Sequence, residues 1–66
     1  MEITRFMNPN RKNVETKSFL PAGIRIRDID QRVLNTEEKY IGIVDENGEM
    51  LGAIQVERLR FIYQWN

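Results

Sequence analysis

The sequence predicts a small single domain over residues 1–66. Its fold class is mainly β, or α+β with one short helix, as a barrel-like or curled antiparallel sheet. An Asn47-Gly48 pair lies between two apolar runs, which is the strongest short-range signal for a β-hairpin. Short segments of alternating apolar and polar residues recur along the chain. Because the chain holds one compact domain, these segments predict five to six short strands around the hairpin.

The first part of the chain contains three expected strands. Ile3–Met7 and Val14–Leu20 have strand-like patterns, and the polar residues 8–13 between them are typical of a turn. Residues 20–23, which include a proline and a glycine, form a second expected turn. Ile24–Arg27 then alternates strictly, so a strand there has one apolar face and one cationic face.

The segment Asp28–Lys39 has the least regular pattern. Its apolar residues Val33 and Leu34 follow Asp30, and aspartate is favoured at the N-cap of a helix. We therefore expect an irregular connection that contains one turn of helix.

The central hairpin pairs Tyr40–Val44 with Met50–Val56 across the Asn47-Gly48 turn. Each of these strands contains a glycine, and both expected registers bring Gly42 and Gly52 near one another across the ladder. A glycine inside a strand often marks a bend or a close approach of another backbone segment.

Two registers remain open for this hairpin. A two-residue turn pairs Val44 with Leu51 and Ile41 with Ile54. A three-residue loop with a left-handed Gly48 instead pairs Tyr40 with Ile54 and shifts all the other pairs of the ladder by the same one residue.

The tail from residue 57 to residue 65 fits two structures. Aromatic and apolar side chains alternate at Leu59, Phe61, Tyr63 and Trp65, which favours a strand. A helical stripe made of Val56, Leu59, Ile62 and Tyr63 fits the same residues. Because aromatic residues are enriched in strands, we predict a strand and keep the helix as the alternative.

Val44–Gly52 reads Val-Asp-Glu-Asn-Gly-Glu-Met-Leu-Gly. It resembles the hairpin in the N-terminal domain of bacterial translation initiation factor three. It is also similar to the second hairpin of nucleotide-binding cystathionine-β-synthase-type regulatory domains. Both families follow that hairpin with a helix. Turn chemistry explains the shared residues, so no functional residue is transferred from either family.

The chain contains no cysteine and no histidine. This composition excludes disulfides, the usual zinc sites, and nucleophilic triads that use histidine or cysteine. We therefore expect a non-enzymatic protein with no cofactor and no metal site. The sequence shows no leader pattern and no apolar run long enough to cross a bilayer, so we expect a cytoplasmic protein that does not bind a membrane.

Lysine and arginine balance aspartate and glutamate at ten each, which argues against DNA binding. The two signs are unevenly placed along the chain. Residues 1–33 carry seven basic side chains against four acidic ones, whereas residues 34–66 carry three against six. Such a two-signed molecule can steer a partner or pair with its own copy. Small cores are often supported by self-association, so we expect a homo-oligomer in preference to a monomer.

These observations lead to three functional hypotheses. The first is a binding module that acts on an unidentified protein partner as an inhibitor or adaptor, of a kind common in phage and mobile-element genomes. The second is a homo-oligomeric binder of a small anionic ligand such as a nucleotide, held by arginines between subunits. The third is an RNA-binding module that uses basic loop residues and the tail aromatics. The candidate binding residues are Arg11, Lys12, Arg25, Arg27, Tyr63 and Trp65.

Overall fold

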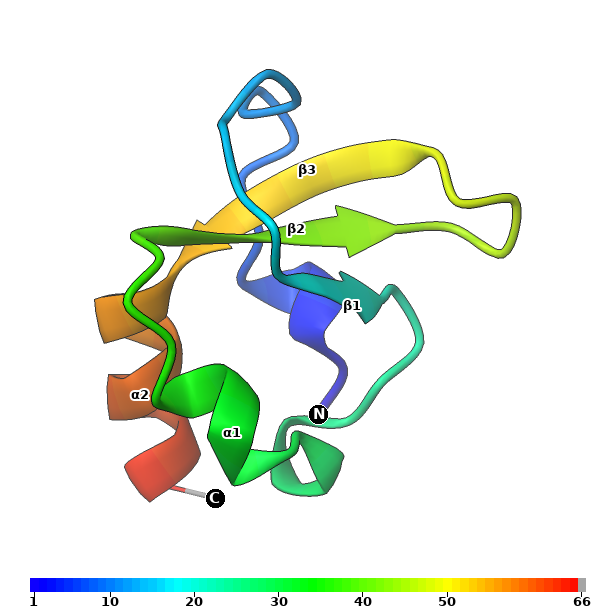
Figure 1. Cartoon of the computed structure of the whole chain (residues 1–66). Coiled ribbons are helices and arrows are strands. Elements are labelled where there is room, and N and C mark those ends of the chain that lie inside the picture. Colours follow the sequence, from blue (N-terminus) through cyan, green and yellow to red (C-terminus); the bar gives the residue numbers. More distant parts are fainter. Residues whose placement is uncertain (66) are drawn as a thin grey trace.

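A computed structural model describes residues 1–65 and shows an open three-stranded mixed sheet with helices at one end and on one face (Figure 1). The fold is therefore α+β. The elements in chain order are the 3₁₀ helix η1 (Ile3–Arg5), strand β1 (Phe19–Pro21), the 3₁₀ helix η2 (Ile26–Asp28), helix α1 (Gln31–Leu34), strands β2 (Tyr40–Val44) and β3 (Met50–Gln55), and helix α2 (Val56–Gln64).

Strand β2 lies at the centre of the sheet. It pairs in parallel with β1, where Leu20 lies beside Ile43, and antiparallel with β3, where Ile41 lies beside Ile54. Among residues 1–65 the sheet has three strands and stays open, so the prediction of a barrel-like antiparallel sheet of five to six strands is wrong.

The β2–β3 hairpin is confirmed, and it combines the two expected registers. Gly48 has a φ of +80°, and the backbone N–H of Asp45 donates to the carbonyl oxygen of Glu49 at 2.9 Å, as in the three-residue loop. Farther from the turn, Ile41 pairs with Ile54, as in the two-residue turn. A bulge at Leu51 supplies the one-residue shift between these registers.

The core lies on the face of the sheet that carries Ile41 and Ile43, both fully buried. Apolar residues from every helix and strand meet there and make up one cluster: Ile3, Leu20, Ile26, Ile29, Leu34, Ile41, Ile43, Ile54, Val56 and Leu59. Because the strands are short, much of this cluster comes from the helices and turns that pack against the sheet.

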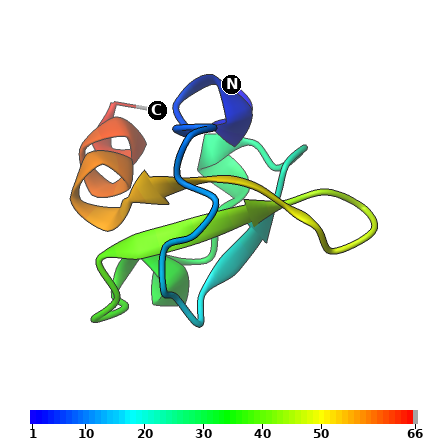
Figure 2. The ribbon, with the colours of Figure 1, turned by 90° about the horizontal axis from the view of Figure 1, so that it is seen from above.

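The N-terminal segment passes around the edge of β3, from the core face to the opposite face (Figures 1 and 2). At the edge, Asn8 and Ala53 exchange two backbone hydrogen bonds, at 2.8 Å and 3.2 Å. The chain then returns across the other face, where the Thr16 hydroxyl donates to the Tyr40 carbonyl oxygen at 2.6 Å. This route brings the chain to β1 on the far side of β2.

Three strands expected in the first half of the chain are corrected. Of Ile3–Met7, the first three residues form η1 instead, which places Ile3 in the core. Val14–Leu20 contributes only its last two residues to the three-residue strand β1. Ile24–Arg27 forms a single antiparallel bridge, Arg25 with Glu2, and then turns into η2. The alternation is too short to determine a strand, and η2 buries Ile26 without one.

The connection from residue 28 to residue 39 contains the single helical turn that the sequence predicts. Asp30 caps α1, because its carboxylate accepts a hydrogen bond from the Arg32 backbone N–H at 2.8 Å.

The tail forms helix α2, so the prediction of a strand there is wrong and the helical alternative holds. Strand β2 begins at Tyr40, which pairs with Gln55, so residues after Gln55 have no β2 residue beside them. A helix satisfies its backbone groups internally, and this one buries Val56 and Leu59 in the core.

Substitution of Gly52 tests the close approach of the N-terminal segment. An added Cβ there would lie 2.5 Å from the backbone oxygen of Asn8 and 3.0 Å from the Cα of Pro9. Since backbone has to move, we expect Gly52→Ala to lower the free energy of unfolding by about 2 kcal/mol in urea denaturation followed by circular dichroism.

The matched control is Gly23→Ala, because nothing lies within 4 Å of its added Cβ. We expect that variant to stay within about 0.5 kcal/mol of the native protein. Equal losses at the two positions would show that the crossing at Gly52 imposes no constraint.

Candidate functional site

Two large aromatic side chains lie on the solvent-facing side of α2: Phe61 within the helix and Trp65 at its C-cap. Successive helical residues turn by about 100°, which places Phe61 between about 140° and 200° from the inward-facing Val56, Leu59 and Tyr63. The core contacts of α2 therefore direct Phe61 away from the protein. We call the five side chains on this side the aromatic face: Glu57, Arg58, Phe61, Gln64 and Trp65.

Phe61 and Trp65 form a pair on this face. Phe61 is 63% exposed and Trp65 is 76% exposed, and their ring centroids lie 6.1 Å apart at an interplanar angle of 57°. This tilted geometry is favourable for two aromatic rings. The rings form a preorganised apolar surface one helical turn long.

The structure separates the two tail aromatics that the sequence singled out. Trp65 is exposed, whereas Tyr63 is partly buried and packs against the core cluster. Phe61 was not among the candidate residues. Its signal was present in the spacing, because it lies four residues from Trp65 and off the stripe of Val56, Leu59, Ile62 and Tyr63.

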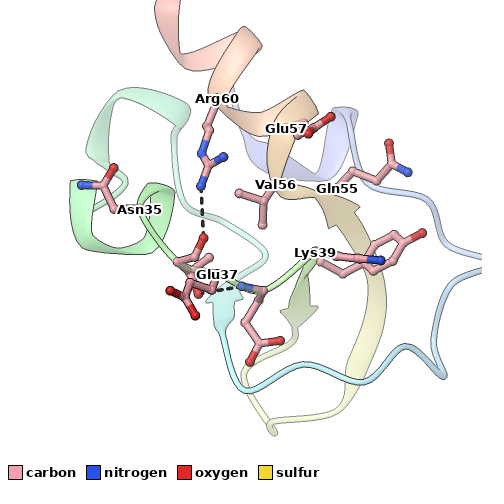
Figure 3. Close-up of a pocket in the computed structure, with 10 residues that line it drawn as sticks. Asn35, Glu37, Lys39, Gln55, Val56, Glu57 and Arg60 are labelled. Carbon is pink, nitrogen blue, oxygen red and sulfur yellow. Dashed lines mark hydrogen bonds between the residues drawn. The ribbon is translucent and has the colours of Figure 1, made fainter.

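A cleft of about 620 Å³ lies beside the start of α2 (Figure 3). The residues that line it are Asn35, Thr36, Glu37, Glu38, Lys39, Tyr40, Gln55, Val56, Glu57 and Arg60. Arg60 reaches from α2 to the end of α1 and the loop that follows it. Its Nε donates to the carbonyl oxygen of Leu34, the last residue of α1, and its Nη2 donates to that of Thr36 in the loop at 3.1 Å. Both charge signs line this cleft, so it presents no uniform potential to a ligand.

The basic loop residues lie on the segment that crosses the sheet. The guanidinium carbon of Arg11 lies 5.1 Å from the centroid of the Tyr40 ring, within the range of a cation–π contact. Lys12 beside it is exposed. Arg11 thus holds the loop against β2, which gives this residue a structural role.

Arg25 and Arg27 lie on different local structures. Arg25 is extended, pairs through its backbone with Glu2, and lines a shallow groove together with Met1, Glu2 and Arg5. Arg27 lies on η2 and does not line that groove. The structure therefore brings Arg25 beside Arg5, whereas the sequence pattern placed it beside Arg27.

One ion pair perturbs the titration of its members. The Arg32 side chain hydrogen-bonds to the Asp30 carboxylate at 2.8 Å, and this contact, with the Arg32 backbone N–H, lowers the pKa of Asp30. The same carboxylate raises the pKa of Arg32. Asp30 is the cap of α1, so the pair belongs to the local fold.

Within residues 1–65 no group of three or more carboxylate, histidine or cysteine side chains is arranged to hold a metal ion. None of the helices described there combines the length and the apolar character needed to cross a membrane.

No family model matches this chain, and neither does any curated protein or solved structure.

Arg60→Lys tests whether the forked contact of Arg60 joins α2 to the loop after α1. Lysine keeps the charge, but its single ammonium nitrogen cannot reach both carbonyl oxygens as the planar guanidinium does. We therefore expect a loss of about 1 kcal/mol in the free energy of unfolding. Arg58→Lys, on the aromatic face of the same helix, is the matched control and should change little in dilute samples. Equal effects from both variants in urea denaturation would contradict the role of Arg60.

Arg32→Ala tests the origin of the Asp30 titration. Since the folded pKa lies below the unfolded one, the charged carboxylate stabilises the native state above the unfolded pKa. That stabilisation is lost as the pH falls through the folded pKa. We expect Arg32→Ala to move the pKa of Asp30 up toward its ordinary value in an NMR titration of the carboxyl carbon. Arg27→Ala is the control, and an unchanged pKa in Arg32→Ala would refute the assignment.

Proposed function

We propose that this protein is a small non-enzymatic binding module that acts on a protein partner through the aromatic face of α2. The observation that carries the proposal is the exposed Phe61–Trp65 pair, which points away from the core. The core cluster does not include either residue, so packing within this chain does not explain them.

Physical chemistry favours a protein as the partner for this pair. Tryptophan and other aromatic residues are enriched among the side chains that dominate binding energy at protein interfaces. The tilted contact between the rings limits their freedom before binding, so less side-chain entropy is lost when a partner covers them. Charged and polar residues border the rings, as in the rim of an interface.

The two alternatives draw weaker support from the geometry. Arg25 and Arg5 line one groove, which suits an anion, but Glu2 lines it too. An RNA-binding surface would use Arg11 and Lys12, and Arg11 already contacts Tyr40. Neither arrangement presents a surface as distinct as the aromatic face.

A capture experiment tests the proposal. We expect the tagged chain, mixed with lysate and with an untagged copy of itself, to retain at least one protein in stoichiometric amount. Phe61→Ser with Trp65→Ser should reduce that capture at least about tenfold, because truncation of central aromatic anchors removes most of the binding energy.

The control variant is Phe19→Leu, which changes an exposed aromatic on β1. It should leave capture intact, and circular dichroism should show that all variants are folded. Capture that survives the double substitution would refute the aromatic face as the binding surface.

A further inference from the structure

We propose that the protein bound by the aromatic face is a second copy of this chain, whose α2 runs antiparallel to the first. This inference rests on the proposed function, because it names the partner of the same surface. It rests on the order of the side chains along α2. When two copies of the helix lie antiparallel, each polar side chain of the aromatic face lies opposite a side chain that it can bind.

The positions of these side chains follow from helix geometry around Phe61. Arg58 and Trp65 both lie to one side of it, at about 60° and about 40°, whereas Glu57 and Gln64 lie to the other side at similar angles. Along the axis, Arg58 is about 4.5 Å before Phe61 and Trp65 is about 6 Å after it. One flank therefore holds a cation and an indole, and the other holds a carboxylate and an amide.

Two antiparallel copies of α2 can be related by a twofold axis that passes between them near Phe61. In that arrangement each flank lies against the same flank of the partner subunit, and the residues of the two flanks run in opposite directions. Arg58 then lies within about 1.5 Å, measured along the axis, of Trp65 of the partner subunit. Guanidinium groups stack favourably on indole rings, and the twofold axis forms this contact twice.

The second flank is complementary in the same way. Glu57 lies at the same level as Gln64 of the partner subunit, so a carboxylate meets an amide that can donate to it. Within residues 1–65 the side chains of Glu57, Arg58 and Gln64 make no hydrogen bond or ion pair, so each is free to make these contacts.

The net charge of the chain is zero, so two copies do not repel one another at long range. A parallel pair, related by a twofold axis along the helices, would exchange the flanks. Arg58 would then face Glu57 of the partner subunit, and Trp65 would face Gln64 of the partner subunit. Exposed ion pairs contribute little, whereas a guanidinium on each indole also covers apolar surface, which favours the antiparallel arrangement.

The contact is small, so the dimer is weak. A helix of nine residues presents less than the roughly 800 Å² per partner that stable interfaces bury. We expect a dissociation constant on the order of 10–100 µM, in the range of transient interfaces.

Sedimentation equilibrium from about 1 µM to about 1 mM tests the association. We expect the native chain to pass from monomer to dimer over that range, and Phe61→Ser with Trp65→Ser to remain monomeric. Gln64→Lys should tighten the dimer about threefold, because each new ammonium group faces Glu57 of the partner subunit. Phe19→Leu is the control and should match the native chain.

Single cysteines test the orientation, because the chain has none of its own. We expect a mixture of Glu57→Cys and Gln64→Cys copies to form a disulfide between unlike chains under mild oxidation. Either variant alone should form little, since like positions lie about 9–12 Å apart along the axis. Efficient disulfide formation by Glu57→Cys alone would overturn the antiparallel arrangement.

The outcomes separate the inference from the proposed function. A native chain that stays monomeric to about 1 mM, yet captures another protein through Phe61 and Trp65, overturns self-pairing and leaves the function intact. A monomer that captures nothing through those residues overturns both. A dimer that the double substitution abolishes supports both.

Discussion

The backbone pairing of Asn8 with Ala53 is the contact on which the rest of the structure depends. It covers part of the edge of β3, which would otherwise present unpaired backbone groups. It also divides the N-terminal segment between the two faces of the sheet, with Ile3 in the core and Thr16 bonded to β2 on the opposite side. Gly52 is necessary here because the passing backbone occupies the space of a side chain.

The hairpin could be predicted from the sequence because its determinants are local. Asn47 and Gly48 specify the turn, and apolar residues on both sides specify the strands. The two registers could not be distinguished, because the bulge at Leu51 lets the chain use both. The helical turn after Asp30 was predictable for the same reason, since an N-cap acts within three residues.

The remaining elements depend on contacts between distant residues. Strand β1 lies parallel to β2, and the pairing of Phe19 with Gly42 leaves no trace in a local pattern. The tail carried both a strand pattern and a helix pattern, and the choice depends on where β2 begins. The sequence singled out Trp65 as a binding candidate, whereas the spacing that sets Phe61 apart from the core acquires its meaning only if α2 is a helix.

The fold gives no reason for phenylalanine at position 61. Its side chain is more than half exposed and lies opposite the face of α2 that packs on the core, so it adds little to the burial that stabilises the domain. Phenylalanine is also a poorer helix former than the lysine, glutamate or glutamine usual at such a position. A small domain has little stability to spare, and it carries this unfavourable residue next to Trp65, which is still more exposed. Because burial within this chain explains neither side chain, Phe61 and Trp65 are the residues on which the proposed binding role of the aromatic face rests.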